Sequence, residues 1–389
     1  MRLLLVSHLL PNPAEPDRGR FVWDQAVALR GLCEVRAVGP VPWFPLKLGH
    51  LRWTRWHYVP RYERKEGIVL GHPRYITLPR RWAFSLVWAF YLKALSAEAS
   101  PPFDLVHAHV LYPDGMAAVV LGRSLGRPVV VTAHGSDVNF YPYERKLWRV
   151  LTVWTAERAD RVVAVSTALK QNLYALGARR ARVVVVPDGV DGRKFFPMDK
   201  SSCARSLGLE PGRRRVVYVG SIEESKGVGV LLEAFERLEG VELFLIGREV
   251  EGYPSRPGVH FVGPVPYERV PLWMGACDLV VQPSFSEGFG MTLIEALSCG
   301  RPVVATESGG PQDIVGEEVG ALVPPGNPEA LADAIDYVLG NLGRYRPEEL
   351  HAYAQGRFGL ERVAERLLEL YREVLYGGGV KGGAEGQVG

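Results

Sequence analysis

Two glutamates flank a glycine-rich turn in the segment SEGFGMTLIEALSCGRPVVAT, residues 286–306. Glu287 lies in the turn, and Glu295 lies eight residues later in a run with the pattern of a helix. The N–H groups and the dipole at the start of that helix favour an anion, and Gly288 and Gly290 allow its close approach. Because carboxylates accept hydrogen bonds from hydroxyls, the pattern favours a diphosphate between two polyhydroxylated rings, which is a nucleotide sugar. The alternative is that both glutamates are ordinary surface and helix-face residues.

A second anion-binding pattern is YVGSIEESKG, residues 218–227. A strand ends at Gly220, and after a turn Lys226 precedes a helix. The arrangement works like a phosphate-binding turn between strand and helix, although a P-loop motif is absent. Lys226 would supply a compact positive charge for the diphosphate, and a solvated lysine without a ligand is the alternative. Gly19, in RGRFVWDQ, also stands just before a helix and would let the backbone approach the donor phosphates.

Histidines follow two strands in the first half of the chain. In VTAHGSDVNFYP, His134 and Asp137 come after a buried strand. His134 is a candidate to hydrogen-bond a sugar hydroxyl or to assist proton movement, Asp137 is assigned to the acceptor side, and a structural histidine is the alternative. In LVHAHVLYPDG, we expect His107 and His109 to face opposite sides of a strand, which argues against a two-histidine metal site. No other metal-binding pattern is present in the sequence, and we predict no metal.

Short apolar runs alternate with helical patterns along the whole chain. The strand candidates of the first half are RLLLVS, CEVRAVGP, DLVHAH, RPVVVTAHG, RVVAVS and RVVVVPDG. Those of the second half are RRVVYVGS, VELFLIG, VHFVG, LVVQPS, RPVVATES and GALVPP. Apolar strands separated by helices indicate parallel sheets covered on both faces. The two successive sets therefore predict an α/β protein with two doubly wound, Rossmann-like domains.

The boundaries of these domains follow from turn signals. The segment VPDGVDGRKFFPMDK, residues 186–200, carries Pro, Gly and Asp and predicts the linker. We place the N-terminal domain at 1–190 and the C-terminal domain at 191–356. An amphipathic helix is predicted over 357–376. The remaining residues, 377–389, have too little apolar content to fold and predict a disordered tail.

The composition is that of an ordinary globular protein, with 389 residues, 47% of them hydrophobic and 23% charged. A net charge of +3 is too small for a dedicated nucleic-acid binder. The four cysteines lie far apart without a CxxC pair, which fits a reduced, cytoplasmic protein. No apolar run reaches the roughly 20 residues that span a bilayer, and we expect the N-terminal run to be a buried strand instead of a signal peptide.

Two segments are candidates to contact a membrane surface. The stretch 43–62 is rich in Trp, Pro, Arg and Tyr, and the segment 80–95 has a basic start and an aromatic, apolar body. The alternatives are a packed surface loop for the first and an ordinary core helix for the second, and these alternatives are favoured.

Together these segments resemble the retaining glycosyltransferases of family 4. The opening segment followed by SGGPQDIV resembles their donor site, whose signature has two glutamates separated by seven residues. YVGSIEESKG, VPDGVD and TAHGSDV are similar to other blocks of that family in the same order. TAHGSDVN and RGRFVWDQA resemble its teichuronic-acid and capsular-polysaccharide branch. The resemblance covers residues 2–376 but does not specify a substrate.

The resemblance implies a GT-B fold, in which two Rossmann-like domains face each other across a cleft and the last helix crosses back to the N-terminal domain. It implies that the nucleotide sugar binds mainly the C-terminal domain and the acceptor the N-terminal domain, without a cofactor or metal. Glu295 would hold the ribose hydroxyls, Glu287 the donor sugar and Lys226 the diphosphate. His134 would face the transferred sugar, so His134, Glu287 and Lys226 are the predicted catalytic set. The predicted donor-binding set is Gly19, Ser221, Lys226, Arg248, Glu287, Gly288, Phe289, Gly290, Met291, Thr292 and Glu295.

The sequence departs from the family pattern at Ser221, where an arginine usually follows the strand-ending glycine. One cation of the diphosphate site is therefore missing from its usual place. Arg248, in LIGREVEG, is the candidate to replace it, and a branch with weaker donor binding is the alternative.

We expect the protein to move a hexose from a UDP- or GDP-linked sugar to a hydroxyl acceptor with retention of anomeric configuration. Charge develops on the diphosphate as the bond to the sugar breaks, so the main task is to stabilise the leaving group. The expected acceptor is a glycan or lipid-linked glycan of cell-envelope polysaccharide synthesis, reached through peripheral contact with the cytoplasmic membrane face. The alternatives are a nucleotide-sugar epimerase or hydrolase on the same fold and a non-catalytic binding protein.

Overall fold

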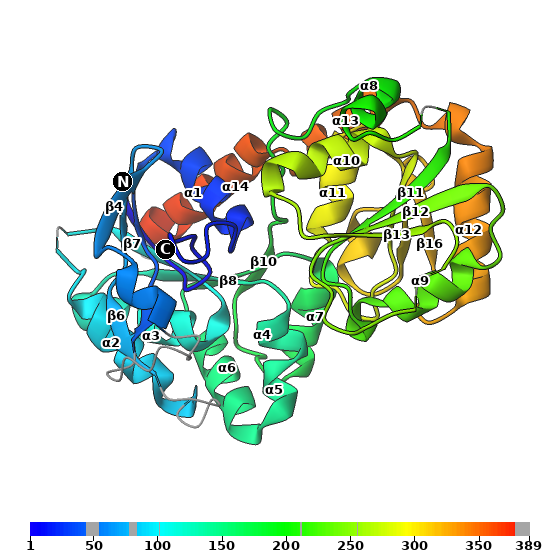
Figure 1. Ribbon diagram of the computed structural model, residues 1–389. Coiled ribbons are helices and arrows are strands. Elements are labelled where there is room, and N and C mark those ends of the chain that lie inside the picture. The colour runs from blue at the N-terminus through cyan, green and yellow to red at the C-terminus, as the bar shows by residue number, and fades with distance from the viewer. Residues whose placement is uncertain (44–53, 78–83, 101, 211, 255, 378–389) are drawn as a thin grey trace, which may run out of the picture. The chain divides into compact units, whose positions relative to one another are not determined.

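The computed structural model describes residues 1–43, 54–77, 84–100, 102–210, 212–254 and 256–377 (Figure 1). These residues form two compact units. Unit 1 comprises Met1–Val165, Leu169–Val186 and the residues from Val363 onward, and unit 2 comprises Ser166–Ala168 and Pro187–Arg362. The boundary between Val186 and Pro187 lies at the start of the segment predicted as a linker. Apart from Gly377, the predicted tail lies outside the described residues.

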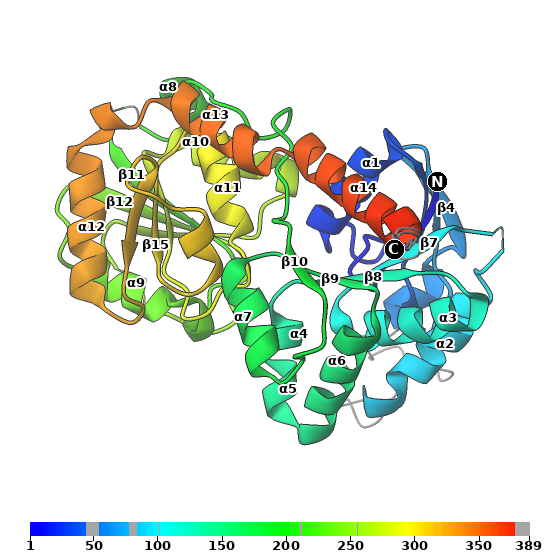
Figure 2. The ribbon, with the colours of Figure 1, turned by 180° about the vertical axis from the view of Figure 1, so that it is seen from behind.

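Unit 1 is built on a sheet whose strands run in the order β10-β9-β8-β7-β1-β2-β5-β4 (Figure 2). Neighbouring strands pair parallel, except that β4 pairs antiparallel with β5 at the edge. The strands are β1 Arg2–Val6, β2 Glu34–Val38, β4 Tyr62–Lys65, β5 Ile68–Gly71, β7 Leu105–His109, β8 Val129–Ala133, β9 Arg161–Ala164 and β10 Val183–Val185. A separate parallel pair consists of β3 Val41–Trp43 and β6 Arg74–Ile76.

Helices cover both faces of this sheet, which is why β7 and β8 are buried along their whole length. Helices α1 and α14 lie on one face, and α2, α3 and α6 lie on the other (Figures 1 and 2). The helices are α1 Arg20–Arg30, α2 Val87–Ser96, α3 Met116–Leu125, α4 Ser136–Asn139, α5 Tyr141–Glu144, α6 Lys146–Arg158, α7 Thr167–Ala175 and α14 Leu360–Tyr376.

The main core of unit 1 joins the two ends of the chain. Leu367 and Tyr371 of α14 pack in one cluster with Trp23 of α1 and Leu5 of β1. This helix begins three residues later than predicted, because Gly359 has a non-helical backbone between the preceding helix α13, Pro347–Phe358, and α14. The apolar stripe read from the sequence is therefore the stripe that closes the core of unit 1.

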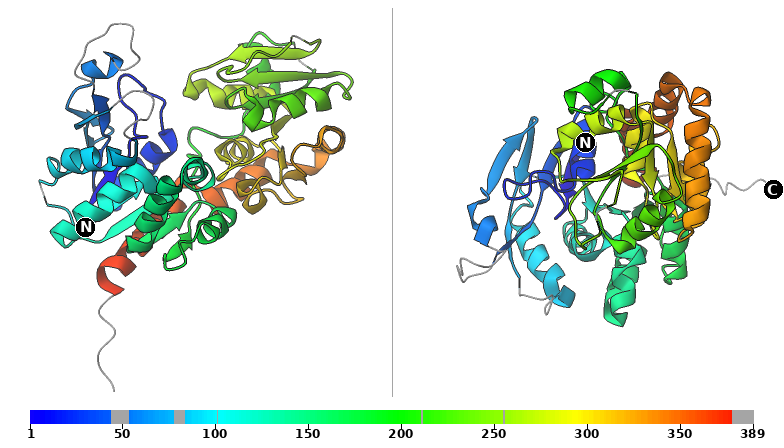
Figure 3. Two further views of the ribbon diagram at one scale, coloured as in Figure 1. Left: turned by 90° about the horizontal axis from the view of Figure 1, so that it is seen from below. Right: turned by 45° about the vertical axis from the view of Figure 1, so that its right-hand side comes forward.

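Unit 2 is built on a parallel sheet with the order β13-β12-β11-β14-β15-β16. Helix α9 packs beside α12, α11 packs beside α13, and α12 flanks β14, β15 and β16 (Figure 3). The strands are β11 Arg214–Val219, β12 Val241–Ile246, β13 Val259–Gly263, β14 Leu279–Gln282, β15 Val303–Thr306 and β16 Gly320–Val323. The helices are α8 Lys200–Ser206, α9 Val228–Phe235, α10 Val270–Ala276, α11 Met291–Ser298, α12 Pro328–Gly340 and α13 Pro347–Phe358.

Each sheet has a point where the strand order reverses. In unit 1 the chain leaves β1 toward β2 on one side and later returns to build β7, β8, β9 and β10 on the other side. In unit 2 the same reversal lies between β11 and β14. In doubly wound sheets, ligands bind at the carboxyl ends of the strands beside this reversal. The fold therefore indicates one candidate ligand edge in each unit.

The twelve predicted strands are all present, which confirms two doubly wound parallel sheets. The strands from β3 to β6 were not predicted, because the region from 40 to 80 was interpreted as irregular. Residues 44–53 of the candidate membrane segment 43–62 lie outside the described residues. The body of the segment 80–95 is the core helix α2, with Val87, Tyr91 and Leu95 buried, and its residues 80–83 lie outside the described part.

Candidate donor and acceptor residues

Lys226 and Glu287 form an ion pair at the reversal point of unit 2. Lys226 ends a 3-10 turn, Glu224–Lys226, that follows β11, and Glu287 lies in the loop that follows β14. The Nζ atom of Lys226 is 2.9 Å from Oε2 of Glu287, and the two side chains are 33% and 17% exposed. The sequence assigned these residues separately to the diphosphate and the sugar, and the structure brings them into direct contact.

The side chain of Glu287 is held by further donors. Its Oε2 atom accepts hydrogen bonds from Nε2 of Gln282 at 3.1 Å and from Oγ of Ser284 at 3.3 Å. Its backbone N–H donates to the carbonyl of Ser308, and its carbonyl accepts from the N–H of Gly310. The backbone of Glu287 therefore joins the loops after β14 and β15, whereas its side chain is held by β14, by its own loop and by Lys226.

Two glycines make this close packing of loops feasible. A Cβ atom on Gly310 would lie 2.3 Å from the Cα of Phe289, and one on Gly227 would lie 2.0 Å from the carbonyl oxygen of Pro283. Gly227 also has φ of 71°, a conformation that L residues rarely adopt. The start of α9 thus presses against the loop that carries Glu287, which positions Lys226 for its ion pair.

Helix α11 begins directly after this loop. Gly290 precedes it with φ of 115°, and Met291 and Thr292 form its first turn. The first N–H groups of an α-helix have no acceptor inside the helix, so they are available to an anion. Phe289 is buried against Phe358 instead of facing the helix start. The carbonyl of Gly288 accepts a hydrogen bond from Ser166.

Glu295 lies in the second turn of α11 and is almost fully buried. Its Oε1 atom accepts a hydrogen bond from the hydroxyl of Tyr267 at 2.9 Å. Tyr267 begins the 3-10 turn Tyr267–Arg269 that precedes α10. The sequence analysis missed Tyr267, and nothing in its local pattern distinguishes it from an ordinary turn residue.

Arg248 lies beside the position where the cation is missing. Ser221 follows β11, and the N–H of Ile222 donates to the carbonyl of Arg248 at 3.0 Å. The two chain segments approach closely because Gly247, with φ of 147°, packs against the carbonyl of Gly220. The side chain of Arg248 is exposed at this edge. The backbone therefore places the candidate replacement next to Ser221.

A second polar pair, which the sequence analysis missed, lies at the reversal point of unit 1. Nδ1 of His8, directly after β1, is 2.6 Å from Oδ2 of Asp114, in the turn that follows β7. The backbone N–H of His8 donates to Oδ1 of the same carboxylate, which is fully buried. The carboxylate thus holds both the imidazole and the backbone of His8, and the ring stays partly exposed. The signal was a polar residue within five residues of the end of each of two strands, but the two residues are 106 positions apart in the sequence.

The histidines of β7 share one face of the strand. The expectation that His107 and His109 face opposite sides is wrong, because side chains two residues apart in a strand point the same way. Their ring centroids are 4.4 Å apart. His109 Nδ1 is 2.9 Å from His134 Nε2, and these two rings stack. Burial lowers the pKa of His107 to about 3 and that of His109 well below its usual range, so both are neutral at neutral pH.

Asp137 serves the backbone around His134. Its carboxylate accepts hydrogen bonds from the N–H groups of Leu111, His134 and Gly135, at 2.9, 3.1 and 3.0 Å. It is fully buried, and these three hydrogen bonds hold the turn that carries His134.

Gly19 precedes α1 with φ of 55°, and a Cβ atom there would lie 2.1 Å from the carbonyl oxygen of Leu9.

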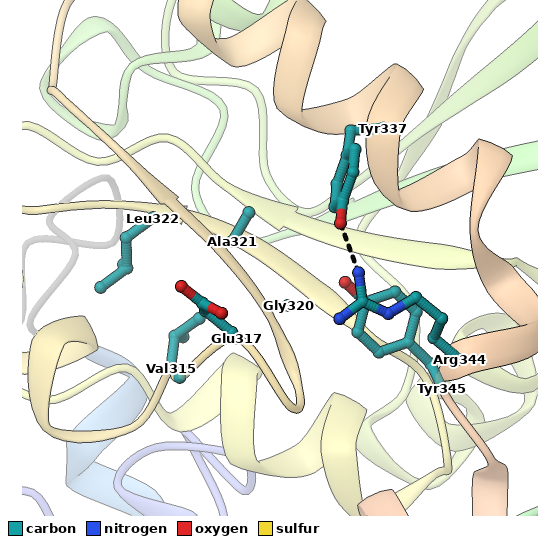
Figure 4. Close-up of a pocket in the computed structure, with 9 residues that line it drawn as sticks. Val315, Glu317, Gly320, Ala321, Leu322, Tyr337, Arg344 and Tyr345 are labelled. Atoms are coloured by element: carbon teal, nitrogen blue, oxygen red, sulfur yellow. Dashed lines mark hydrogen bonds between the residues drawn. The ribbon is translucent and has the colours of Figure 1, made fainter.

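A separate cavity of about 500 Å³ lies beside β16 in unit 2 (Figure 4). It is lined by Val315, Gly316, Glu317, Gly320, Ala321, Leu322, Tyr337, Arg344 and Tyr345. None of the predicted site residues lines it. Among the described residues, no group of three His, Cys, Asp or Glu side chains is arranged to hold a metal, and no helix has the length and apolar character to span a membrane.

The two Rossmann-like units, each with polar groups at its reversal point, define the GT-B class of glycosyltransferases. A solved sucrose-phosphate synthase from Thermosynechococcus elongatus shares this fold, with a TM-score of 0.79, 22% identity and coverage of 97% of this chain and 100% of that chain. Anabaena HepE, solved in complex with UDP-glucose, has a TM-score of 0.71, 21% identity and coverage of 96% and 100%.

The sequence comparisons define the family. Residues 19–193 match the family model "Glycosyltransferase Family 4", and residues 199–356 match "Glycosyl transferases group 1". A Bacillus subtilis (strain 168) glycosyltransferase named for teichuronic acid biosynthesis, TuaC, is 30% identical over 96% of this chain and 99% of its own length. The D-inositol 3-phosphate glycosyltransferase 1 of Catenulispora acidiphila is 30% identical over 82% and 84%. The chain belongs to glycosyltransferase family 4.

Proposed function

We propose that this glycosyltransferase moves a hexose from a UDP- or GDP-linked sugar to a hydroxyl acceptor, with retention of anomeric configuration. The observation that carries the proposal is the Lys226–Glu287 pair at the reversal point of unit 2, beside the first turn of α11. An ammonium group and helix N–H groups at one sheet edge suit a diphosphate. The complexes of Anabaena HepE with UDP and UDP-glucose support a UDP-linked donor.

The donor would be held by carboxylates on both sides of the diphosphate. The side-chain contacts of Glu287 with Lys226, Gln282 and Ser284 are all made by its Oε2 atom, and we assign its Oε1 atom to a hydroxyl of the donor sugar. We assign Glu295 to the ribose hydroxyls and Arg248 to the diphosphate, as the cation that replaces the missing one at Ser221. The family resemblance supports the assignments of Glu287 and Glu295, and the place of Arg248 beside Ser221 supports the third assignment.

The chemical step would depend on stabilising the leaving diphosphate. Negative charge grows on it as the sugar bond breaks, and Lys226 with the N–H groups of Met291 and Thr292 would meet that charge. We propose that these protein groups do this without a metal or cofactor. Because Glu287 holds Lys226 before the donor arrives, little reorganisation is needed during the reaction.

The acceptor would bind unit 1. We assign His134 to a hydroxyl of the transferred sugar, with Asp137 holding its turn, and add His8 as a group that orients the acceptor hydroxyl. Nδ1 of His8 faces Asp114, so its Nε2 atom is the ring nitrogen left for a ligand. The name of the Bacillus subtilis relative supports an acceptor from cell-envelope polysaccharide synthesis, a glycan or a lipid-linked glycan. We further propose that the enzyme works on the cytoplasmic membrane face through peripheral contact.

Thermal unfolding with candidate donors tests the donor site. A ligand that binds only the folded protein raises the melting temperature, so UDP-, GDP- and ADP-sugars are compared in the presence of a chelator. One donor should raise it in the wild type and in Glu348→Gln, an exposed glutamate of α13, but not in Glu295→Gln. If no donor shifts the wild type, the proposed site is wrong. NMR of the product with and without an acceptor then separates transfer, with retained or inverted configuration, from hydrolysis and epimerisation.

A further inference from the structure

We propose that the outer side of α5 and α6 in unit 1 docks on an anionic membrane surface. Four large apolar side chains are exposed there: Phe140 by 56%, Tyr143 by 66%, Leu147 by 50% and Val150 by 59%. Leu147 and Val150 lie one helical turn apart on α6, so they share a side of that helix. We call these four residues the α5–α6 face. The inference rests on the proposed membrane contact and names the surface that makes it.

The charges around this face match an anionic lipid surface. Arg145, Lys146 and Arg149 are exposed between and beside the apolar residues, and Glu144 is the single acidic residue from 140 to 150. A helix with basic side chains beside exposed aromatic and aliphatic ones is typical of proteins that lie in the membrane interface. Basic side chains near anionic headgroups each strengthen binding. Soluble monomers rarely leave such apolar groups together in water without a partner.

The opposite side of α6 is packed against unit 1, so Leu147 and Val150 remain exposed to solvent. Trp148 is buried, its ring packs edge-on against Phe84 at 4.7 Å, and its Nε1 donates to Oγ of Ser85 at 3.0 Å. The helix is therefore fixed to the 3-10 turn Phe84–Leu86 that precedes α2. The packing of Trp148 therefore leaves Leu147 and Val150 on the outer side of α6.

The position of the face suits a lipid-linked acceptor. Helix α4 begins two residues after His134, and α6 then leads the chain from the carboxyl edge of β8 back to the start of β9. The chain therefore enters α5 and α6 from the sheet edge that carries His134 and the His8–Asp114 pair. If the α5–α6 face docks on the membrane, an acceptor anchored in that membrane would lie near this sheet edge.

Vesicle co-sedimentation of the full chain at low salt tests the inference. The vesicles are phosphatidylcholine alone or phosphatidylcholine mixed with phosphatidylglycerol. The apolar variant is Leu147→Ser with Val150→Ser, and the charge variant is Lys146→Glu. The matched control is Leu32→Ser with Leu125→Ser, two leucines of unit 1 with similar exposure, 43% and 46%. Melting temperatures establish that all variants fold.

The wild type and the control should bind the mixed vesicles and should not bind pure phosphatidylcholine. The apolar variant should bind the mixed vesicles at least about tenfold more weakly than the wild type, and the charge variant about fivefold more weakly.

Three results would contradict the inference. If the wild type does not bind the mixed vesicles, the membrane contact itself is refuted, whereas the donor-binding results stand independently. If the wild type binds but the apolar variant binds as well as the control, the α5–α6 face is the wrong surface. A dimer of the wild type that the apolar variant loses would show that the face is a protein interface, which also overturns the inference.

Discussion

Nδ1 of His109 lies 2.9 Å from Nε2 of His134, and the two imidazoles stack with an angle of 14° between their planes. His109 is fully buried, and its Nε2 atom has no hydrogen-bond partner within the described part of the chain. A hydrogen bond between these two ring nitrogens needs one donor and one acceptor, so the tautomer of His109 determines which role Nε2 of His134 takes. His109 therefore positions His134 and determines which of its nitrogens carries the proton.

Replacing His109 should impair turnover more than donor binding. We expect His109→Phe to lower kcat by about tenfold, because one hydrogen bond worth about 1 kcal/mol and the fixed tautomer of His134 are both lost. His109→Asn keeps a polar atom near the former Nδ1 position and should recover part of the rate. The rate of transfer and the donor-induced shift in melting temperature are measured together. A loss of donor binding equal to the loss in kcat would contradict a positioning role.

Removing the ammonium of Lys226 should lower kcat/KM. The expected loss of transition-state stabilisation is about 2–4 kcal/mol, by comparison with other preorganised hydrogen-bond donors. Lys226→Ala also leaves Glu287 without its cation, so donor binding should fall as well. Lys226→Arg restores a charge with different geometry and should be intermediate. The exposed Lys93 provides the control, since Lys93→Ala should match the wild type. Near-normal turnover of Lys226→Ala would contradict the assignment of Lys226 to the leaving diphosphate.

The hydroxyl of Tyr267 should support Glu295 in donor binding. Tyr267→Phe keeps the ring but removes the 2.9 Å hydrogen bond, so the carboxylate of Glu295 loses one fixed orientation. We expect the dissociation constant of the preferred donor to rise by about fivefold, which corresponds to roughly 1 kcal/mol. Calorimetric titration of the wild type and the variant measures the change. An unchanged constant would mean that the tyrosine has no part in the donor site.

Two glycines of unit 2 should respond in opposite directions to alanine. In Gly310→Ala the new Cβ would lie 2.3 Å from the backbone of Phe289, a clash that no side-chain rotation relieves. The free energy of unfolding should fall by about 3 kcal/mol. Gly356, exposed inside α13 with no atom within 4 Å of a new Cβ, should gain about 0.5–1 kcal/mol as alanine. Denaturant unfolding measures both, and equal effects at the two sites would contradict the packing of the loops.

Acid should destabilise unit 1 through its buried histidines. Burial lowers the pKa of His107 to about 3, whereas the unfolded chain takes up this proton at about pH 6.5. Between these values the unfolded state binds one more proton, so the free energy of unfolding falls as the pH falls, by about 1.4 kcal/mol per pH unit for one histidine. His107→Gln should show a shallower decline between about pH 6.5 and pH 5. Urea unfolding across that range gives the slopes, and parallel slopes would exclude this role for His107.

The strands and their grouping could be predicted because each parallel strand is a short, nearly continuous apolar run. The hairpin of β4 and β5 escaped prediction because its YERK strand is polar and lies at the sheet edge, where no apolar pattern is required. The positions of Glu287, Glu295 and Lys226 after strands or in a helix were readable from spacing. Their side-chain partners were not, because a rotamer and a neighbouring loop decide whether Lys226 meets Glu287.

The pairing of His8 with Asp114 could not be predicted from the sequence. The two residues follow β1 and β7, strands that are distant in the chain and adjacent in the sheet. Each alone resembles an ordinary turn residue. Only the strand order brings them together, and the strand order depends on how the helices between them pack. The error over His107 and His109 was different, since the period of a strand already places them on one face.

The position of α14 also determines when the protein can be completed during synthesis. Most of unit 1 precedes unit 2 in the chain, but Leu367 and Tyr371 belong to its core, and the hydroxyl of Tyr371 is 2.6 Å from Nδ1 of His107. Unit 2 contains Pro187–Arg362, so all of it is translated before that core can close. The unit that is begun first is therefore finished last, and a nascent chain halted before α14 exposes its sheet to chaperones and proteases.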